Sequence, residues 1–335
     1  MISRSLYGEN ILTELRYNPL EDRYVMTAGH RQARPQMPTD GCPFCPGSGK
    51  VPEHYRVYAY PNDFPALSDP PWETTQPDRD LYHVLPARGH CEVILYTPDH
   101  HGSIANLPDD HLLDLFRLWR ERYEFFGKKK EIRYVLIFEN KGAVIGVTMP
   151  HPHGQLYAFP FIPPRLEKEL RQAEEYYRRT GQNLLNTIRD QEIEDGLRVI
   201  FQEEEFTAFI PFFADFPYEV HIHPNSDEVS LSDFDDARGL QLMRTIRLMV
   251  RTYNCLYGFE LPFMMSLHQK PTESREYPGF RFYVKFTPLH RGPDNIKYCA
   301  TCETVGNAHC NPSYPEQRAE ELRQAFRKAQ GEIEK

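Results

Sequence analysis

The sequence predicts an α+β protein that consists of a duplicated unit, in which helices pack on a mostly antiparallel sheet. Two stretches support this prediction, because each passes from a strand through a loop into a helix: residues 90–127 and 218–258. The first stretch begins with "CEV" and the second with "YEV". We therefore expect an N-terminal half over residues 1–196 and a C-terminal half over residues 197–335.

Hydrophobic periodicity gives the elements of the N-terminal half in order. The first residues, up to about 75, are rich in Pro, Gly, Asp and Arg, which predicts loops with short strands. Alternating apolar residues in "EVILY" predict a strand, and a helical spacing follows at Leu112, Leu113, Leu115, Phe116 and Trp119. Two further strands are expected in "IRYVLIFEN" and "GQLYAFPF", and one polar helix over residues 164–196.

The C-terminal half repeats this strand and helix and adds further elements. Apolar alternation predicts strands in "FELPFMMSLHQ" and "GFRFYVKFTPL", and an amphipathic helix is expected over residues 315–330. Only the N-terminal half contains the run His-Pro-His, whereas the corresponding strand of the C-terminal half carries Tyr283 and Lys285. We therefore expect the N-terminal half to hold the chemistry and the other half mainly to support it.

The composition is that of a globular protein, with 40% hydrophobic and 26% charged residues and a net charge of −9. Duplex binding needs clustered Lys and Arg, and no basic stripe is present, so we expect no nucleic-acid partner. No apolar run approaches the ~20 residues of a membrane span, and the N-terminus has no apolar region that would signal secretion. We expect a cytoplasmic protein without a membrane partner, in which the seven cysteines are ligands or core residues rather than disulfides.

Cys42 and Cys45 form a CxxC motif in "GCPFCPG", a turn that suits two thiolates converging on one ion. Two more ligands could come from the histidines of "TPDHH" and "PHPH". Spacing alone does not decide between His100 and His101. Two cysteines and two histidines would form a tetrahedral zinc site, and the alternative is a pair of buried thiols in a proline-rich turn.

Two other groups of potential ligands occur in the C-terminal half. One is the group Cys299, Cys302, His309 and Cys310. It could form a second zinc site, or a loop that packs against the rest of the protein. The other is the pair His221 and His223, which share one face of a strand. No thiol or carboxylate pair accompanies them, so we interpret them as an exposed or hydrogen-bonded strand pair.

His151 and His153 also share one face if "PHPHGQLYAF" is extended. A single ion could bind both imidazoles. However, Cys42, Cys45 and one distant histidine leave room for just one more ligand in a closed tetrahedral site. This favours a division in which one imidazole binds the metal and the other faces a ligand.

The surrounding residues favour a phosphate as that ligand. A neutral imidazole is a competent nucleophile at phosphorus, and the phosphoramidate that it forms can be discharged again. Gln155 can stabilise charge on a phosphoryl oxygen, and Gly154 permits close approach of the backbone to a ligand. The preceding loop offers the features of a phosphate-binding loop at Asn140, Lys141, Gly142 and Gly146. The alternative is a pair of core histidines at the end of a strand.

These motifs resemble a known family. The segment "FENKGAVIGVTMPHPHGQLYAF" resembles the active-site segment of galactose-1-phosphate uridylyltransferases, which belong to the histidine-triad superfamily. The resemblance covers nearly the whole chain, because "RYNPLEDRYVMTAGHRQARP", "CPFC", "YPNDFPAL", "CEVILYTPDHH" and "IKYCATCETVGN" follow in the family's order. It implies a duplicated histidine-triad-like unit. It also implies a nucleotidyltransferase that exchanges UMP between UDP-glucose and galactose 1-phosphate, by a ping-pong mechanism through a uridylyl-histidine intermediate.

The resemblance further implies roles for individual residues. His153 matches the family's nucleophile and Gln155 its phosphate-binding glutamine. One structural zinc ion per subunit is implied by matches at Cys42, Cys45, His100 and His151. Substrate contacts are implied at Arg31 and Arg34 for the nucleotide phosphates, at Asn62, Asp63 and Phe64 for the uridine, and at Asn140, Gly146 and Thr148 for the phosphate. Lys297 and Tyr298 match a loop that in the family reaches into the partner subunit's active site, which implies a homodimer with shared active sites.

The sequence departs from the family's pattern at two places. Some members hold a second metal, and Glu169 and His268 match two of its ligands. Tyr283 and Lys285 replace the other two, so we expect no second metal. His309 stands where some members have a glutamine that contacts the sugar nucleotide, which leaves the sugar open. The alternatives are an ADP-sugar phosphorylase or adenylyltransferase, a hydrolase that releases free UMP, and an inactive zinc-stabilised nucleotide-binding protein.

Overall fold

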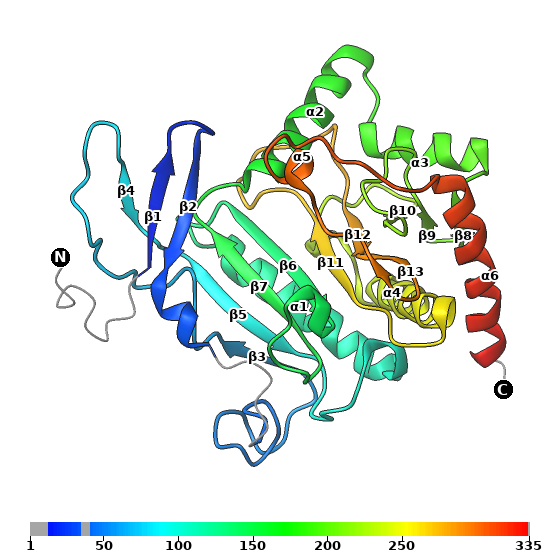
Figure 1. The fold of residues 1–335 in the computed structure, drawn as a ribbon, viewed down its shortest axis with the longest axis horizontal. Helices are drawn as coiled ribbons and strands as arrows, with labels where there is room; N and C mark the ends of the chain where they lie inside the picture. Colours follow the sequence, from blue (N-terminus) through cyan, green and yellow to red (C-terminus); the bar gives the residue numbers. More distant parts are fainter. Residues whose placement is uncertain (1–12, 35–40, 334–335) are drawn as a thin grey trace.

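The computed structural model describes residues 13–34 and 41–333 and confirms the α+β prediction (Figure 1). The first residues of the N-terminus, on which we based the absence of a secretion signal, lie outside this range. Among the helices of the described part, none combines the length and the apolar character that a membrane crossing would require.

One antiparallel sheet of nine strands runs through the molecule in the order β3-β5-β7-β6-β11-β12-β10-β9-β8. The N-terminal half contributes β3 (Tyr58–Pro61), β5 (His90–Leu95), β6 (Tyr134–Lys141) and β7 (His153–Phe159). The C-terminal half contributes β8 (Val199–Gln202), β9 (Phe206–Phe209), β10 (Val220–Pro224), β11 (Phe263–His268) and β12 (Tyr283–Pro288). The two halves join where β6 pairs with β11, so they share one sheet rather than forming separate ones.

The strand order is the same when it is read from either side of this junction. β7 lies between β5 and β6, and β12 lies between β10 and β11 in the same way. The first residues of these two corresponding strands are His153 and Tyr283. The arrangement agrees with the predicted duplication, and it places Tyr283 and Lys285 where the other half has His153 and Gln155.

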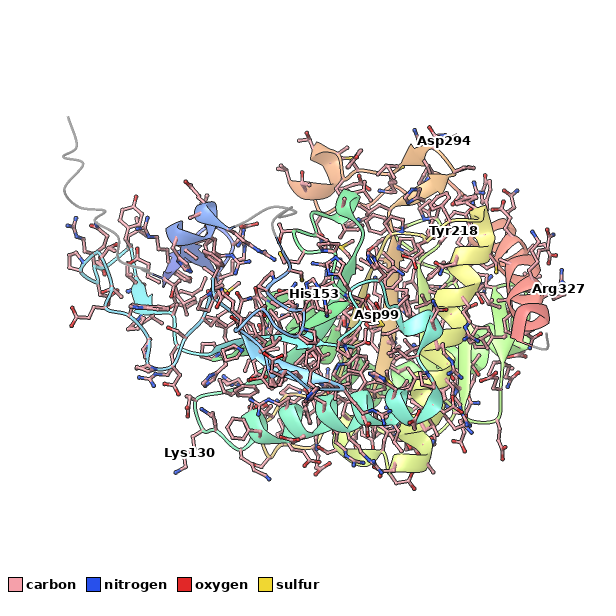
Figure 2. The ribbon with its side chains drawn as sticks, turned by 90° about the horizontal axis from the view of Figure 1, so that it is seen from below. Asp99, Lys130, His153, Tyr218, Asp294 and Arg327 are labelled. Atoms are coloured by element: carbon pink, nitrogen blue, oxygen red, sulfur yellow. The ribbon has the colours of Figure 1, made fainter. Side chains whose placement is uncertain are left out.

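Two long helices, α1 (Asp109–Gly127) and α4 (Asp236–Tyr257), lie side by side on one face of the sheet (Figures 1 and 2). Their apolar side chains form the main core together with the strands, and Trp119 and Met243 are completely buried in it. Gly239 allows the close contact between the helices, because a Cβ atom there would lie 2.1 Å from the ring of Phe116. The C-terminal helix α6 (Pro315–Ile333), which was predicted over residues 315–330, packs against α4.

The single helix predicted over residues 164–196 is wrong, because two helices occupy this stretch: α2 (Pro164–Thr180) and α3 (Leu184–Asp195). Gly181 ends α2 in the left-handed conformation with φ +71°. Asn183 then starts α3, because its side chain accepts hydrogen bonds from the backbone N–H groups of Leu185 and Asn186. Both capping residues are visible in the letters "TGQN", but the polar helical pattern continues on either side of them, so the stretch was predicted as one helix.

The remaining elements are short. A three-stranded sheet consists of β1 (Thr13–Asn18), β2 (Arg23–Ala28) and β4 (Val84–Pro86). Single turns of 3-10 helix are η2 (Gly29–Ala33), η3 (Ile104–Asn106), η4 (Ala143–Ile145) and η5 (Leu231–Asp233). Near the C-terminus, β13 (His290–Gly292) and β14 (Asn295–Ile296) form a hairpin that precedes the short helix α5 (Thr301–Thr304).

Side chains of β7 alternate between the two faces of the sheet. Leu156 and Ala158 belong to the main core beneath α1 and α4. Tyr157 belongs to a separate cluster on the opposite face. Gln155 and His153 share that face with Tyr157, because they precede it by two and four residues on the same strand. The predicted chemistry therefore lies on the side of the sheet that the long helices leave open.

Candidate active site and metal centre

Four predicted metal ligands come together from three separate segments of the chain. Each of Cys42, Cys45, His100 and His151 offers one ligand atom, and these atoms all lie within 4.8 Å of one another. Sγ of Cys45 lies 3.4 Å from Nδ1 of His100 and 3.7 Å from Nδ1 of His151. His101, the alternative that spacing left open, has an exposed side chain and is not part of the group. Among the described residues, no other group of this kind is found.

The imidazole of His151 is oriented for binding a metal. Its Nε2 atom lies 2.8 Å from the carbonyl oxygen of Thr97 and 3.2 Å from the hydroxyl of Tyr55. Nε2 therefore carries the proton, and the lone pair on Nδ1 faces the cysteines. Burial lowers the pKa of His151 to about 4, which keeps the ring neutral as a ligand must be.

The turn that holds the two cysteines is closed by its own backbone. The N–H of Cys45 donates to the carbonyl of Cys42 over 3.2 Å, and the N–H of Phe44 lies 3.4 Å from Sγ of Cys42. Burial, with a further contribution from Cys42, raises the pKa of the Cys45 thiol to about 11. Two thiols are therefore held close together where a bound cation would stabilise them as thiolates.

His153 is fixed in the tautomer that nucleophilic attack requires. Its Nδ1 atom donates to the backbone carbonyl of His151 over 2.7 Å, which leaves the Nε2 lone pair available. Burial lowers the pKa of His153, and the side chain is only 8% exposed, so the ring is neutral and shielded. The ring of Phe44 packs against both histidines, with its centroid 6.0 Å from that of His151 and 5.8 Å from that of His153.

Gly154 is needed for the packing of the core beneath the site. A Cβ atom at this position would lie 2.3 Å from the hydroxyl oxygen of Tyr96, on the helix-covered face of the sheet. The absent side chain therefore makes room for Tyr96 rather than for a ligand. Gln155 is buried on the other face, beside His153.

The predicted phosphate loop follows β6. Asn140 lies near the end of that strand, and the chain then turns through η4 between two glycines with positive φ, Gly142 at +95° and Gly146 at +84°. The hydroxyl of Thr148 is buried without a hydrogen-bond partner among the described residues. An unpaired buried hydroxyl in such a loop is available to a phosphoryl oxygen.

Arg31 and Arg34 approach the same face of the sheet from η2. Arg31 donates to the carbonyl of Phe64 over 2.7 Å and to the hydroxyl of Tyr157 over 3.3 Å, so it links the N-terminal segment to β7. Burial lowers the pKa of Arg34, and the neighbouring charge of Arg31 lowers it further. The positive charge of Arg34 in turn contributes to the lowered pKa of His153. No carboxylate of the described part of the chain pairs with Arg34, which leaves a cation near His153.

Asn62, Asp63 and Phe64 form a corner immediately after β3. The side chain of Asn62 accepts a hydrogen bond from the N–H of Phe64 over 2.9 Å. The carboxylate of Asp63 accepts hydrogen bonds from Lys50 and from Tyr60, each over 2.8 Å. These hydrogen bonds hold the corner in place, and the carbonyl of Phe64 joins it to Arg31.

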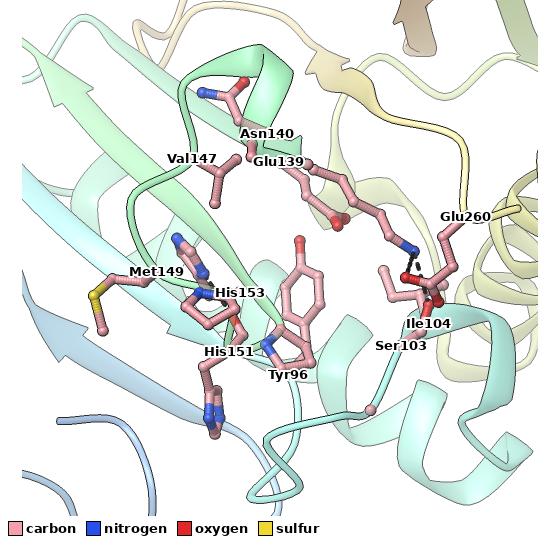
Figure 3. Close-up of a pocket in the computed structure, with 16 residues that line it drawn as sticks. Tyr96, Ser103, Ile104, Glu139, Asn140, Val147, Met149, His151, His153 and Glu260 are labelled. Atoms are coloured by element: carbon pink, nitrogen blue, oxygen red, sulfur yellow. Dashed lines mark hydrogen bonds and ion pairs between the residues drawn. The ribbon is translucent and has the colours of Figure 1, made fainter. Parts of the chain in front are cut away.

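Sequence reasoning missed two residues below the phosphate loop (Figure 3). Tyr96 and Glu139 line a cavity of about 200 Å³ together with Asn140 and His153. The hydroxyl of Tyr96 and Oε2 of Glu139 are buried without hydrogen-bond partners among the described residues. Burial raises the pKa of Glu139 to about 7. The only sequence signal was a glutamate in an otherwise apolar strand, which does not reveal which way the side chain points.

Lys297 and Tyr298 lie in the C-terminal half, after β14. The ammonium group of Lys297 forms an ion pair with Glu303 and lies 4.8 Å from the ring centroid of Phe216. Tyr298 is 68% exposed. Within one chain, the contacts of Lys297 are therefore with its own half and not with the predicted phosphate loop. Cys299, Cys302 and Cys310 are all exposed and do not gather as metal ligands.

The four positions at which some family members bind a second metal are occupied by a hydrogen-bonded network. Nδ1 of His268 and the hydroxyl of Tyr283 lie 2.9 Å and 3.0 Å from the same oxygen of Glu169. Burial alone would raise the pKa of Glu169, but these two partners lower it to about 2. Lys285 instead binds Glu219 over 2.7 Å. Each carboxylate of the network, Glu169 and Glu219, is thus bound by neighbouring side chains.

Comparison with known proteins gives consistent matches. The family model for the galactose-1-phosphate uridyl transferase N-terminal domain matches residues 7–163, and the model for the C-terminal domain matches residues 169–330. The chain is 33% identical over 315 residues to the galactose-1-phosphate uridylyltransferase of Thermotoga maritima, which covers 93% of this chain and 98% of the relative. It is 28% identical to the enzyme of the same name from Haemophilus influenzae, over 92% of this chain and 93% of the relative.

Solved structures agree with these matches. A structure described as a uridylyltransferase superimposes with a TM-score of 0.86 at 29% identity, and the match covers 94% of this chain and 99% of that one. An ADP-glucose phosphorylase from Arabidopsis thaliana with bound ADP-glucose superimposes with a TM-score of 0.72 at 24% identity, covering 93% of this chain and 98% of that one. The second match, at this identity, is evidence for the fold alone.

Proposed function

The chain belongs to the galactose-1-phosphate uridylyltransferase family, and on that premise we propose that it exchanges a uridylyl group between UDP-glucose and galactose 1-phosphate. The observation that carries the proposal is the hydrogen bond from Nδ1 of His153 to the carbonyl of His151, because it leaves a neutral imidazole with its Nε2 lone pair available. A uridylyl-histidine intermediate splits one transfer into two matched steps, so that one pocket serves both sugar phosphates.

In the first step, Nε2 of His153 attacks the α-phosphorus of UDP-glucose. The phosphorus–nitrogen bond forms, and the bond to the bridging oxygen breaks, so that glucose 1-phosphate leaves with the electron pair. The uridylylated ring keeps its Nδ1 proton and becomes cationic, and the His151 carbonyl that accepts the hydrogen bond from this N–H then stabilises the positive charge. In the second step, a phosphate oxygen of galactose 1-phosphate attacks the same phosphorus, and the ring leaves as neutral imidazole.

The charge that develops on the phosphoryl oxygens needs donors around the reacting phosphorus. Gln155 lies two residues after His153 on the same face of the strand. The hydroxyl of Thr148, which has no hydrogen-bond partner among the described residues, and the guanidinium of Arg34 are the other two candidates. Donors that are already in place reduce the reorganisation that the transition state would otherwise require.

Zinc is the ion that fits this group of four residues: Cys42, Cys45, His100 and His151. Two thiolates and two imidazoles are a common tetrahedral ligand set for zinc, and the four ligand atoms lie close enough together to share one ion. The tautomer of His151 supports this assignment, since Nδ1 faces the cysteines while Nε2 donates to Thr97. Four protein ligands leave no open position, so the role of the ion is structural. Its binding would fix the backbone of His151 and hence the ring of His153.

We propose further that the active protein is a homodimer whose active sites are shared. Exposed apolar and aromatic side chains of the C-terminal half support an interface there: Tyr298 at 68%, Val305 at 82% and Tyr314 at 71% exposure. In such a dimer, Lys297 and Tyr298 would meet the partner's substrate. Analytical ultracentrifugation of the wild type and of Val305→Glu tests this, because the variant should dissociate. A wild type that sediments as a monomer would contradict it.

Mass spectrometry of the intact protein tests the proposed chemistry. After mixing with UDP-glucose, the protein should gain the mass of one uridylyl group (UMP less one water) on His153, and subsequent galactose 1-phosphate should remove this group as UDP-galactose. ADP-glucose is the comparison, and an adduct from ADP-glucose alone would refute the uridylyl assignment. Release of free UMP without an acceptor would instead indicate hydrolysis.

A further inference from the structure

A second, larger cavity is lined by side chains of α2 and α3, at the end of the N-terminal half, and of β10 and β12 in the C-terminal half. Its volume is about 690 Å³, within the range of small-molecule sites. It occupies the position in the C-terminal half that the catalytic site occupies in the N-terminal half, because Tyr283 and Lys285 on β12 correspond to His153 and Gln155 on β7. The transfer reaction proposed above makes no use of it.

The carboxylates that line this cavity are already paired with neighbouring groups. Glu219 binds Lys285 over 2.7 Å, and Arg165 binds Asp215 over 2.8 Å. Glu169 is bound by two neighbours, as described above. Each carboxylate that lines the cavity therefore has a partner, and the lining cation without one among the described residues is Lys168, which is exposed. A charged group buried beside His223 would have to break one of the ion pairs, which favours an uncharged ligand there.

Two histidines that line the cavity, His223 and His309, each have a buried ring nitrogen without a hydrogen-bond partner among the described residues, and His223 is the more deeply buried of the two. Its side chain is 2% exposed and lines the cavity, and its Nε2 atom has no hydrogen-bond partner among the described residues. Burial holds the pKa of His223 well below its ordinary value, so the ring is a neutral imidazole. A buried nitrogen without a partner is unfavourable by about 1–3 kcal/mol, and a ligand that bonds to it would remove that penalty.

The walls around His223 are apolar and aromatic. Leu184, Leu185 and Ile188 of α3 form one side. The ring of Tyr283 forms another, with its centroid 5.2 Å from that of His223. A free hexose carries hydroxyl groups on all sides and would leave most of them unpaired against such walls. A flat heteroaromatic ring has apolar faces and polar edges, and it can stack on the walls while one edge reaches the imidazole.

We propose that this cavity is a second ligand site, which binds an uncharged heteroaromatic compound of nucleoside size through a hydrogen bond to Nε2 of His223. Asn307 and His309, from the segment that follows α5, also line the cavity. A bound ligand would therefore contact the same segment of chain that continues from Lys297 and Tyr298. The proposal does not depend on the transfer reaction, since the site is separate from His153.

Nuclear magnetic resonance of the full chain with ¹⁵N-labelled histidine tests the proposal without any need for turnover. Uridine and adenosine are titrated separately, and the imidazole signals are assigned with single histidine variants. We expect the His223 and His221 signals to shift saturably with at least one nucleoside. Nucleoside that enters the catalytic site instead would shift the His153 signal, so the two sites are read separately.

Two variants complete the test. Ile188→Trp fills the cavity from a partly exposed position and should abolish the shift, whereas His223→Phe removes the hydrogen bond and should weaken binding at least tenfold. Thermal unfolding shows that each variant is folded. The proposal is overturned if neither nucleoside moves the His221 and His223 signals at millimolar concentration, if only the His153 signal moves, or if folded Ile188→Trp protein binds as the wild type does.

Discussion

Nδ1 of His153 lies 2.7 Å from the backbone carbonyl oxygen of His151, whose own side chain faces Cys45. In the proposed mechanism, His151 would thus supply a metal ligand from its side chain and the acceptor that orients the nucleophile from its backbone. The two histidines would then have separate roles, and the hydrogen bond makes the orientation of His153 depend on the position of His151. This relationship predicts that mutation of one histidine should affect transfer and mutation of the other should affect metal binding.

His153→Gly should abolish transfer while leaving the metal content unchanged. The variant removes the attacking nitrogen but none of the four metal ligands. Loss of a nucleophile typically lowers kcat by about 10⁴-fold or more. Covalent labelling by UDP-glucose and metal analysis of the purified protein measure the two effects. Retention of full transfer activity would show that another residue is the nucleophile.

His151→Asn should show the opposite pattern and lose the metal. Because the binding energy of a structural metal is also folding energy, the melting temperature should fall by about 5 °C or more. His101→Asn is the matched control, since this neighbour of a ligand is exposed and outside the group. It should keep both the metal and the melting temperature. Equal metal loss in both variants would mean that the ligand set has been assigned wrongly.

Much of the metal site could be predicted, because it depends on residue types whose chemistry is specific. Cysteines and histidines that are far apart in sequence have few reasons to occur in such motifs other than a shared ion. Spacing could not choose between His100 and His101, since both follow the same strand and only the packing of the loop turns one of them inward. The family resemblance selected His100, and the structure places His100 in the group.

Other parts of the site could not be predicted, because they arise from contacts between distant segments. Nothing in the letters around Phe44 shows that its ring packs against His151 and His153. Gly154 was interpreted as room for a ligand, but the side chain that needs the room is Tyr96, from a neighbouring strand. A glycine in the sequence does not show which face of the sheet needs the space that its missing side chain leaves.

Gly154→Ala tests that contact, and a second substitution can relieve it. The new Cβ atom would lie 2.3 Å from the hydroxyl oxygen of Tyr96, so the variant should lose about 1–3 kcal/mol of unfolding free energy. Tyr96→Phe alone should change stability little, because its hydroxyl has no hydrogen-bond partner among the described residues. In the double variant, part of the loss should be recovered. Strictly additive effects in urea unfolding would argue against direct contact.

Glu139→Gln should change how stability depends on pH. Burial raises the pKa of Glu139 to about 7 from an ordinary value of 4.5, so between these values the folded state holds a proton that the unfolded state has lost. The contribution of Glu139 to stability therefore falls as pH rises through this window, by up to about 1.4 kcal/mol per pH unit. Glutamine does not titrate, and the variant should gain stability relative to the wild type between pH 5 and pH 8.

Urea unfolding at pH 5 and pH 8 measures this difference, and Glu276→Gln is the control because that carboxylate is exposed. The control should keep the pH dependence of the wild type, whereas Glu139→Gln should have a flatter one. If Glu139→Gln and the wild type differ equally at both pH values, Glu139 is ionised in the folded state throughout. It would then add a negative charge close to His153, which would oppose the approach of an anionic phosphate, and the uridylyl transfer would have to overcome that repulsion.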